Sequence, residues 1–339
     1  MKVMDKEEIL KKDRIGEVFR ERNLLVMLRH ERLCNSYYAF QDAKRLYLVM
    51  DIALGGDMRY NLEHNIPEKK PFGESRVKFY IAQLVLALDY IHGKRVLHRD
   101  IKPDNILMDA RGWIKLSDFG ISGIMDVDGF CYQKSGTKGY AAPELYHTSH
   151  KHGLQSDFYS LAVTMHEFLT LFRPFSEAAL RRPSRPNGEE PTLRCDTTEF
   201  KKHGLSLACT DLMRGMLKMR PEDRLSTEKI KTHEWFAQEG GLHYFEDLSQ
   251  GRGQAEFVPD ITKMNANPDS DIHEFFQGRE EYNKLRVPNP EEQALFTAYD
   301  FDFEKDTNEL LERGDFNYLS SLTQVPAEDH EIVTSGAAD

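Results

Sequence analysis

The chain has 339 residues, a formal net charge of −11 and a mean hydropathy of −0.59. It contains no run near the roughly 18–20 apolar residues that a membrane-spanning helix needs, so we expect no transmembrane segment. The opening residues lack the apolar core of a secretory signal. Four widely spaced cysteines fit neither a zinc site nor a disulfide framework. This favours a reducing compartment, the cytoplasm, with the nucleus as the alternative.

The charge is unevenly distributed along the chain. Residues 257–339 carry six basic and 19 acidic residues, whereas residues 1–256 carry 39 basic and 37 acidic ones. A near-neutral body with an acidic tail lacks the basic footprint of a nucleic-acid-binding protein, so no nucleic-acid partner is expected.

The predicted elements run from a small strand-containing part to a mostly helical part. The opening is interpreted as a strand end followed by a charged turn, and the apolar run at 45–54 as a buried strand. Helical spacing of apolar residues predicts helices over 15–28, 75–93, 156–172, 205–218 and 226–237. Short β-like pieces lie in RVLHRD, NILMD and WIKLSD. The segment 178–204 predicts a loop, and the tail from 238 is expected to wrap a surface.

Three motifs follow one another after the 75–93 helix. The sequence HRDIKPDN at 98–105 resembles the catalytic loop of eukaryotic protein kinases. DFG at 118–120 and APE at 142–144 come next, in the order and at the spacing of the metal-binding triplet and the end of the activation segment. A single triplet is a weak signal, but three motifs in this order are specific.

The resemblance implies a role for each polar residue of these motifs. Asp100 would accept or orient the proton of a substrate hydroxyl, and Lys102 would neutralise charge on the transferred phosphoryl group. Asn105 and Asp118 would bind Mg²⁺, which prefers hard oxygen ligands. Thr137, in GTKGY, would hydrogen-bond Asp100 and Lys102. A lysine at 102 is typical of serine/threonine kinases rather than tyrosine kinases.

An ion pair upstream would complete the phosphate site. Lys2 and Glu21 stand 19 residues apart, the Lys at a predicted strand end and the Glu within a predicted helix. The resemblance implies that they hold the α- and β-phosphates of ATP. Taken alone, they would be interpreted as surface charges, because Glu17 lies one turn from Glu21 on the same face.

The segment RLYLVMDIALGGDM at 45–58 resembles the strand and hinge that hold adenine. Met50 would be the gatekeeper, and the backbones of Asp51 and Ala53 would contact the base. Leu107 would pack beneath adenine, although a core residue would look the same in sequence. Asp57 would lie near the ribose or a basic residue of the peptide, with a turn-capping role as the alternative.

Three further residues resemble structural positions of the family. Glu144 and Arg224 would form the buried pair that anchors the activation segment. Asp157 opens the 156–172 helix and would brace the backbone of the catalytic loop. Because a buried carboxylate without a partner is costly, each pairing is a testable prediction.

The wider pattern resembles the AGC group and, within it, the YANK (serine/threonine kinase 32-like) branch, through VFRERNLL, LVMDIALGGDMRYNLEHNI, SGTKGYAAPE and RPEDRLS. The implied fold is α+β and bilobal: a partial small lobe at 1–53, a helical large lobe at 54–237 and an acidic tail at 238–339. Residues 296–301 resemble the hydrophobic motif that AGC tails dock onto their own small lobe. Asp300 occupies the place of a phosphorylatable residue there. The alternative is a generic aromatic patch.

The sequence departs from the kinase pattern at three places. No Gly-rich phosphate loop precedes Lys2. We expect the reason to be a gene model that begins at an internal Met. A membrane-targeting signal encoded upstream is left open. Gln133 occupies the usual position of the activating phosphothreonine, so Arg99 would lose a charge-assisted partner. Ser36 stands where a large apolar residue is expected in the stack linking the lobes.

The expected function is therefore that of a signalling serine/threonine protein kinase, which uses ATP and Mg²⁺. Asp57 and Asp104 weakly indicate protein substrates with basic residues before the phosphate acceptor. The alternative is a catalytically impaired pseudokinase that acts as a scaffold, motivated by the absent phosphate loop, Gln133 and the acidic tail. A small-molecule kinase is disfavoured, because the activation segment has the form that docks peptides.

Overall fold

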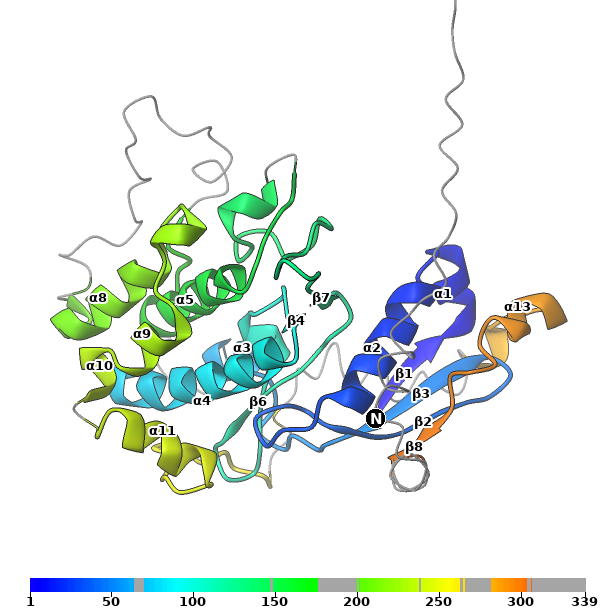
Figure 1. Ribbon diagram of the computed structural model, residues 1–339. Helices are drawn as coiled ribbons and strands as arrows, with labels where there is room; N and C mark the ends of the chain where they lie inside the picture. The colour runs from blue at the N-terminus through cyan, green and yellow to red at the C-terminus, as the bar shows by residue number, and fades with distance from the viewer. Residues whose placement is uncertain are drawn as a thin grey trace, which may run out of the picture.

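The computed structural model of the protein describes residues 1–63, 70–146, 149–175, 200, 202–237, 239–262, 265, 282–303 and 306. Most of the predicted 178–204 loop and much of the 238–339 tail therefore lie outside the described residues. Figure 1 shows a sheet-containing small lobe beside a larger helical lobe. None of the helices in the described ranges has both the length and the apolarity to cross a membrane.

The small lobe is built on a four-stranded antiparallel sheet with the strand order β1-β3-β2-β8. Its strands are β1 (Lys2–Asp5), β2 (Ser36–Gln41), β3 (Arg45–Met50) and β8 (Phe301–Asp302). β3 is the central strand of the first three, with Val3 opposite Tyr47 and Ala39 opposite Leu48. The strand predicted for 45–54 thus ends earlier than expected, because the chain leaves the sheet after Met50.

Two helices follow β1. The predicted helix at 15–28 is confirmed as α2 (Ile15–Met27), which buries Val18, Leu24 and Leu25. The charged turn expected before it is instead α1 (Lys6–Lys11). This prediction was wrong because Lys6 and Ile9 are buried by tertiary contacts: Lys6 Nζ donates to Gln41 and to Gln293 of the tail.

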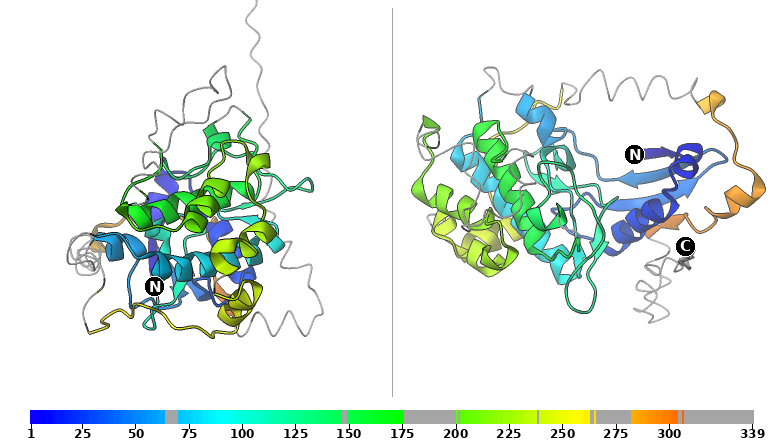
Figure 2. Two further views of the ribbon diagram at one scale, coloured as in Figure 1. Left: turned by 90° about the vertical axis from the view of Figure 1, so that its left-hand side faces the viewer. Right: turned by 90° about the horizontal axis from the view of Figure 1, so that it is seen from above.

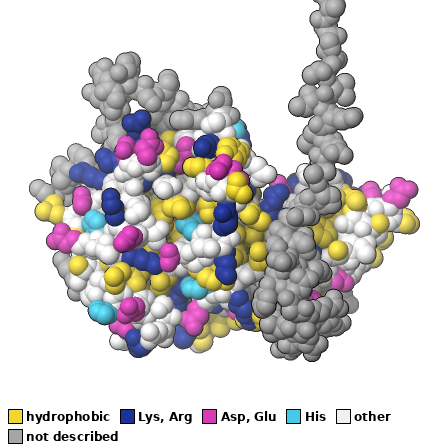
Figure 3. Space-filling view, viewed as in Figure 1, with side chains coloured by type: hydrophobic (Ala, Val, Ile, Leu, Met, Phe, Trp, Pro, Cys, Tyr) yellow, Lys and Arg dark blue, Asp and Glu magenta, His cyan; other side chains and the backbone are white. Residues whose placement is uncertain are grey.

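The large lobe surrounds two long helices that pack against each other, α4 (Glu74–Gly93) and α5 (Gln155–Thr170). α5 is buried almost all round, as its apolar sequence predicts. The shorter helices are α3 (Met58–Glu63), α8 (Leu207–Met216), α9 (Thr227–Lys231), α10 (Glu234–Ala237) and α11 (Leu242–Ser249). Acidic and basic side chains are interspersed over this lobe on the face in Figure 3.

Short antiparallel ladders hold the motif loops at the junction of the lobes. β4 (Val96–Leu97) pairs with β7 (Gly123–Ile124), and β5 (Ile106–Met108) pairs with β6 (Ile114–Leu116). The 3-10 turn Pro103–Asn105 directly precedes β5. The catalytic loop therefore leaves β4 and enters β5, while the DFG triplet lies between β6 and β7. The two motifs are brought together by pairing rather than by sequence proximity.

The described parts of the tail lie on both lobes. α11 packs on α4 and α10, and its Phe245 and Leu248 are buried in the large lobe. α13 (Pro290–Ala294) and β8 lie along the small lobe, as the orange segment in Figure 2 shows. Ser36, the unexpected polar residue, is buried and its Oγ donates to Val49 O at 3.2 Å, so its hydroxyl is satisfied by β3.

Candidate active site

Asp100, Lys102 and Thr137 form a closed triangle of hydrogen bonds. Lys102 Nζ lies 2.7 Å from Asp100 Oδ2 and 2.8 Å from Thr137 Oγ1. Thr137 Oγ1 in turn donates to Asp100 Oδ1 at 2.5 Å. Asp100 is only 6% exposed, so its carboxylate is held in one orientation by two charged or polar partners. The structure thus brings together three residues that the sequence separates by up to 37 positions.

Asn105 joins this triangle and leads to Asp118. Asn105 Nδ2 donates to Asp100 O and to Asp100 Oδ2, both at 2.9 Å. Its backbone oxygen accepts bonds from Ser117 N and Ser117 Oγ, at 2.9 and 3.0 Å. These bonds tie Asn105 to the residue just before Asp118. Since the Asn105 amide nitrogen is committed to Asp100, its amide oxygen is the atom left for a cation.

Asp118 faces Lys2, which faces Glu21. Lys2 Nζ lies 2.6 Å from Glu21 Oε1 and 3.5 Å from Asp118 Oδ1. Burial alone would raise the pKa of Asp118, but the Lys2 ammonium holds it below its ordinary value. Burial raises the pKa of Glu21, and the same ammonium opposes that rise. The same lysine therefore stabilises the ionised form of both carboxylates.

The donor set fits a magnesium-nucleotide rather than an all-protein metal cage. An amide oxygen and a half-exposed carboxylate, those of Asn105 and Asp118, are hard ligands of the kind Mg²⁺ takes. Mg²⁺ keeps several waters and binds through one or two carboxylates plus substrate phosphates. Among the residues that the structure describes, no group of three His, Cys, Asp or Glu side chains could hold a metal alone.

Asp157 sits beneath the catalytic loop. It is fully buried, and its two carboxylate oxygens accept the backbone N–H groups of His98 at 2.9 Å and Arg99 at 2.8 Å. His92 Nε2 lies 2.8 Å from the same carboxylate. Arg99 and Asp118 both have positive φ angles, of 67° and 63°, which are rare for residues other than glycine. Buried partners such as Asp157 are needed to hold such a backbone in place.

Glu144 and Arg224 form a two-point ion pair. Arg224 Nη1 and Nη2 each donate to one oxygen of Glu144 at 2.7 Å, and the Arg224 side chain has no exposed area. The guanidinium also donates to the backbone carbonyls of Gln155, Lys218 and Met219. The pair links the end of the activation segment to the turn before α9.

The hinge segment contains a polar hub at Asp51. Its side chain accepts bonds from Lys115 Nζ at 2.8 Å and Tyr37 Oη at 2.7 Å, and also from Asn35. This hub ties the hinge to β6 in the neighbouring ladder.

The other two hinge residues predicted at the adenine site lie on either side of this hub in the sequence. Met50 is partly buried at the end of β3, and Ala53 O accepts a turn bond from Gly56 N at 3.1 Å.

Two residues predicted near the nucleotide lie close to one another. Leu107 is partly exposed between the buried residues Ile106 and Met108, and it bridges to Asp57. Asp57 Oδ1 accepts the backbone N–H of Tyr60 at 2.7 Å, at the beginning of α3. The capping role, which the sequence left open as the alternative, is therefore present in the structure.

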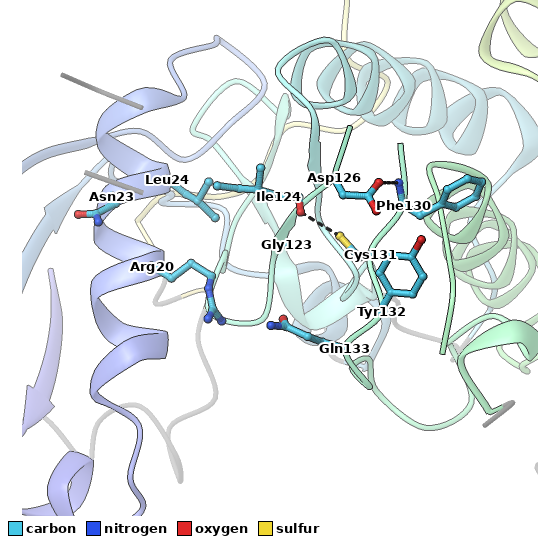
Figure 4. Close-up of a pocket in the computed structure, with 10 residues that line it drawn as sticks. All are labelled: Arg20, Asn23, Leu24, Gly123, Ile124, Asp126, Phe130, Cys131, Tyr132 and Gln133. Carbon is cyan, nitrogen blue, oxygen red and sulfur yellow. Dashed lines mark hydrogen bonds between the residues drawn. The ribbon is translucent and has the colours of Figure 1, made fainter. Parts of the chain in front are cut away.

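The activation segment borders a pocket of about 440 Å³ between α2 and residues 123–133. Figure 4 shows Arg20 on the α2 side and Gln133 on the other, with Tyr132 beside it. Arg99 lies close by, and its guanidinium donates to backbone oxygens of Ile121 at 2.6 Å and Ser122 at 3.0 Å. Arg99 is thus bonded to the backbone of the segment that carries Gln133.

Sequence reasoning missed two charged residues at the site. Lys115 was not singled out, because its partner Asp51 is 64 positions away. Arg59 was not singled out either, although its position two residues after Asp57 could have drawn attention to it. Its guanidinium contacts Glu167, Tyr140 and Asp104.

Comparison with known proteins agrees with this geometry. The model of the family described as protein kinase domain matches residues 1–236. Human serine/threonine-protein kinase 32C is 34% identical over 281 residues, which cover 81% of this chain and 55% of that protein. Human serine/threonine-protein kinase 32B is 33% identical over 283 residues, or 81% and 64%. Protein kinase 2 of Dictyostelium discoideum is 33% identical over 241 residues, or 70% and 47%.

These relatives confirm the resemblance to serine/threonine kinase 32 that the motifs indicated. The chain spans 55% of the length of kinase 32C and 64% of kinase 32B. The family model covers well over half of the chain and includes every motif from Lys2 to Arg224. The chain therefore belongs to the protein kinase family.

Proposed function

We propose that this chain is a serine/threonine protein kinase that transfers the γ-phosphoryl group of ATP to a protein hydroxyl. The observation that carries the proposal is the hydrogen-bonded triangle of Asp100, Lys102 and Thr137, which Asn105 joins from the edge that leads to Asp118. Phosphoryl transfer needs positioning and charge neutralisation more than covalent chemistry. A fixed carboxylate beside a fixed ammonium supplies both.

Each residue of the site has a proposed part in the transfer. Asp100 orients the acceptor hydroxyl and takes its proton, and Lys102 neutralises charge on the phosphoryl group as it moves. Thr137 bonds both side chains and holds them in a fixed relative position. Lys2, aligned by Glu21, holds the α- and β-phosphates. Asn105 and Asp118 would hold Mg²⁺, which would supply positive charge to neutralise the phosphates when it is bound.

The same proposal assigns the remaining predicted residues. Adenine would contact the backbones of Asp51 and Ala53, with Met50 behind it and Leu107 beneath it.

The free, buried state of Cys34, Cys131 and Cys209 supports a reducing location, the cytoplasm or the nucleus. Asp57 and Asp104 support a preference for substrates with basic residues before the acceptor. Asp104 is also in contact with Arg59, which limits how far it can bind such a residue.

We further propose that the tail docks in cis on the small lobe. Phe296 and Tyr299 are fully buried, and Arg22 Nη2 donates to Ala298 O at 2.5 Å. Gln41 Nε2 donates to Phe296 O at 2.8 Å and lies 3.2 Å from Asp300 Oδ1. The charge of Asp300 also opposes the lowering of the Lys6 pKa that burial causes, which supports a role in which Asp300 provides a permanent negative charge.

The function is tested by measuring phosphate transfer from Mg-ATP to a serine peptide with the purified chain and with Asp100→Asn. Losing the base lowers the rate by about 10²–10⁴-fold while Mg-ATP binding is kept. Asp128→Asn, which changes an exposed carboxylate, serves as the control. Equal rates for wild type and Asp100→Asn would refute the proposal. Retained Mg-ATP binding without transfer by the wild type would favour the scaffold instead.

A further inference from the structure

Arg59, the second residue of α3, is held by acidic and phenolic groups from three other elements. Its Nη1 lies 2.9 Å from Glu167 Oε1 on α5, and its Nη2 lies 2.6 Å from Tyr140 Oη in the activation segment. Its Nε lies 3.5 Å from Asp104 Oδ2 of the catalytic loop. Tyr140 Oη also donates to Glu167 Oε2 at 2.5 Å. We call these four residues the Arg59 cluster.

The cluster adjoins the side of the site where an acceptor peptide has to lie. Asp104 comes four residues after Asp100 on the same loop, and Tyr140 comes three residues after Thr137, which bonds Asp100. A peptide that presents its hydroxyl to Asp100 would lie against the catalytic loop and the activation segment, because both contribute side chains at that carboxylate. Side chains from both segments that meet at one point therefore lie within reach of residues near the acceptor.

The chemistry of the cluster is that of a guanidinium site. Glu167 is 7% exposed, and a carboxylate buried to this degree needs a cation. Burial alone would lower the pKa of Arg59, but the hydrogen bond and charge of Glu167 raise it above its ordinary value. Burial and the same carboxylate raise the pKa of the Tyr140 hydroxyl, which stays a neutral donor. A planar guanidinium can donate two parallel hydrogen bonds to one carboxylate, whereas a lysine ammonium cannot.

We propose that Arg59 fills from within the chain an acidic subsite that would otherwise select an arginine of the substrate, so that it determines specificity. This inference rests on the proposed kinase function. With Arg59 in place, Glu167 is already paired. The exposed carboxylates left at the cluster are those of Asp104 and Glu63, whose side chains are 48% and 54% exposed and which also contact Arg59. The wild type consequently does not select for arginine at the peptide position that reaches the cluster.

The test is an arginine scan of a serine peptide whose other residues are alanine, covering four positions before and two after the acceptor. Wild type is compared with Arg59→Ala, with the double variant Arg59→Ala/Glu167→Gln, and with Arg111→Ala. Arg111 is an exposed arginine paired with Asp109, so its variant controls for the loss of one positive charge. The measured quantity is the ratio of kcat/KM for each arginine peptide to that of the all-alanine parent.

At the position that reaches the cluster, we expect ratios within about 2-fold of one for wild type and Arg111→Ala. For Arg59→Ala the ratio rises at least about 10-fold at one position before the acceptor, the order of one buried charge-assisted pair. The double variant loses that gain. A purely structural role for Arg59 would lower all rates without changing their ratios. Such unchanged ratios, or the same arginine preference in wild type and Arg59→Ala, would overturn the inference.

A binding measurement keeps this test separate from the test of catalysis. Fluorescence anisotropy of an alanine-for-serine version of the selected arginine peptide is recorded with wild type and with Arg59→Ala. Tighter binding by about 10-fold to Arg59→Ala supports the inference even if no variant transfers phosphate. Equal binding counts against it. If Arg59→Ala does not fold, Arg59→Met keeps the apolar stem of the side chain and takes its place in both measurements.

Discussion

Arg224 and Glu144 meet through two parallel hydrogen bonds of 2.7 Å in a place where the arginine side chain has no exposed area. The pair joins the end of the activation segment to a turn 80 residues later. Because neither charge is solvated, each side chain depends on the other.

Arg224→Ala is therefore expected to lower the free energy of unfolding by about 3–5 kcal/mol, the cost of leaving a buried carboxylate without its partner. Arg220→Ala, four residues earlier, removes an arginine whose pair with Glu222 is mostly exposed, and it should cost no more than about 1 kcal/mol. Urea unfolding of both variants checks this. Similar losses for the two would contradict the burial argument.

Asp157→Asn is expected to change how stability depends on pH. Burial would raise the pKa of Asp157, but bonds from His92 and from backbone N–H groups hold it below its ordinary value. The ionised carboxylate thus stabilises the fold above the unfolded pKa of about 3.9, and this contribution is lost as pH falls through the lower folded value.

Unfolding free energies measured from pH 7 down to 3 therefore test Asp157 directly. The difference between wild type and Asp157→Asn should be constant above about pH 5 and should shrink below about pH 4. Asp89→Asn, which alters a half-exposed carboxylate paired with Lys231, should follow the wild type within about 0.5 kcal/mol. A difference that grows on acidification would contradict the assignment.

Lys2→Met should lower phosphate transfer by about 10²–10³-fold, as expected for the loss of one fixed positive group at the developing charge. Lys2 is the cation between Glu21 and Asp118, so its removal also leaves those two carboxylates facing each other. Lys11→Met, which changes an exposed lysine paired with Glu7, is the matched control. Steady-state kinetics that gave equal rates for the two variants would exclude Lys2 from the site.

Thr137→Val should lower kcat by about 10- to 100-fold, because its hydroxyl bonds both members of the charged pair Asp100 and Lys102. Thr137→Ser keeps the hydroxyl and should recover most of the rate. Thr137→Val keeps the methyl group and removes only the hydroxyl, so a valine variant with the wild-type rate would show that the hydrogen bonds are not what Thr137 contributes.

Phe296→Ala should cost about 3–5 kcal/mol of local stability, because its ring is fully buried against the small lobe. Its neighbour Leu295 is 51% exposed, so Leu295→Ala should change little. Hydrogen exchange in β2 and α2 measures the effect where the tail lies. Unchanged protection in Phe296→Ala would mean that the tail does not stabilise this lobe.

The sequence was most informative where chemistry restricts the residue type. Asp100, Asn105 and Asp118 were singled out because their motifs resemble those of protein kinases. The structure brings Asp100 and Asn105 into hydrogen-bond contact, and the roles of all three in transfer stay predictions. Long apolar helices such as α5 were also predictable, since their periodicity is local.

What could not be predicted depends on distant partners. α1 forms from a highly charged segment because Lys6 finds acceptors up to 287 residues away. The strand β8 exists only because it pairs with β2, and a two-residue strand leaves no periodic signal. The neighbours of Arg59 come from segments 45 to 108 residues distant, so no local pattern reveals that its charge is already neutralised.

The tail contacts both lobes and also the hinge, where Asn265 Nδ2 donates to Leu54 O at 2.9 Å. The tail residue that contacts the hinge and the aromatic segment at 296–301 belong to one polypeptide. The aromatic segment is therefore presented to the small lobe at an effective concentration on the order of millimolar. A separate molecule carrying the same aromatic sequence would have to reach that concentration to compete.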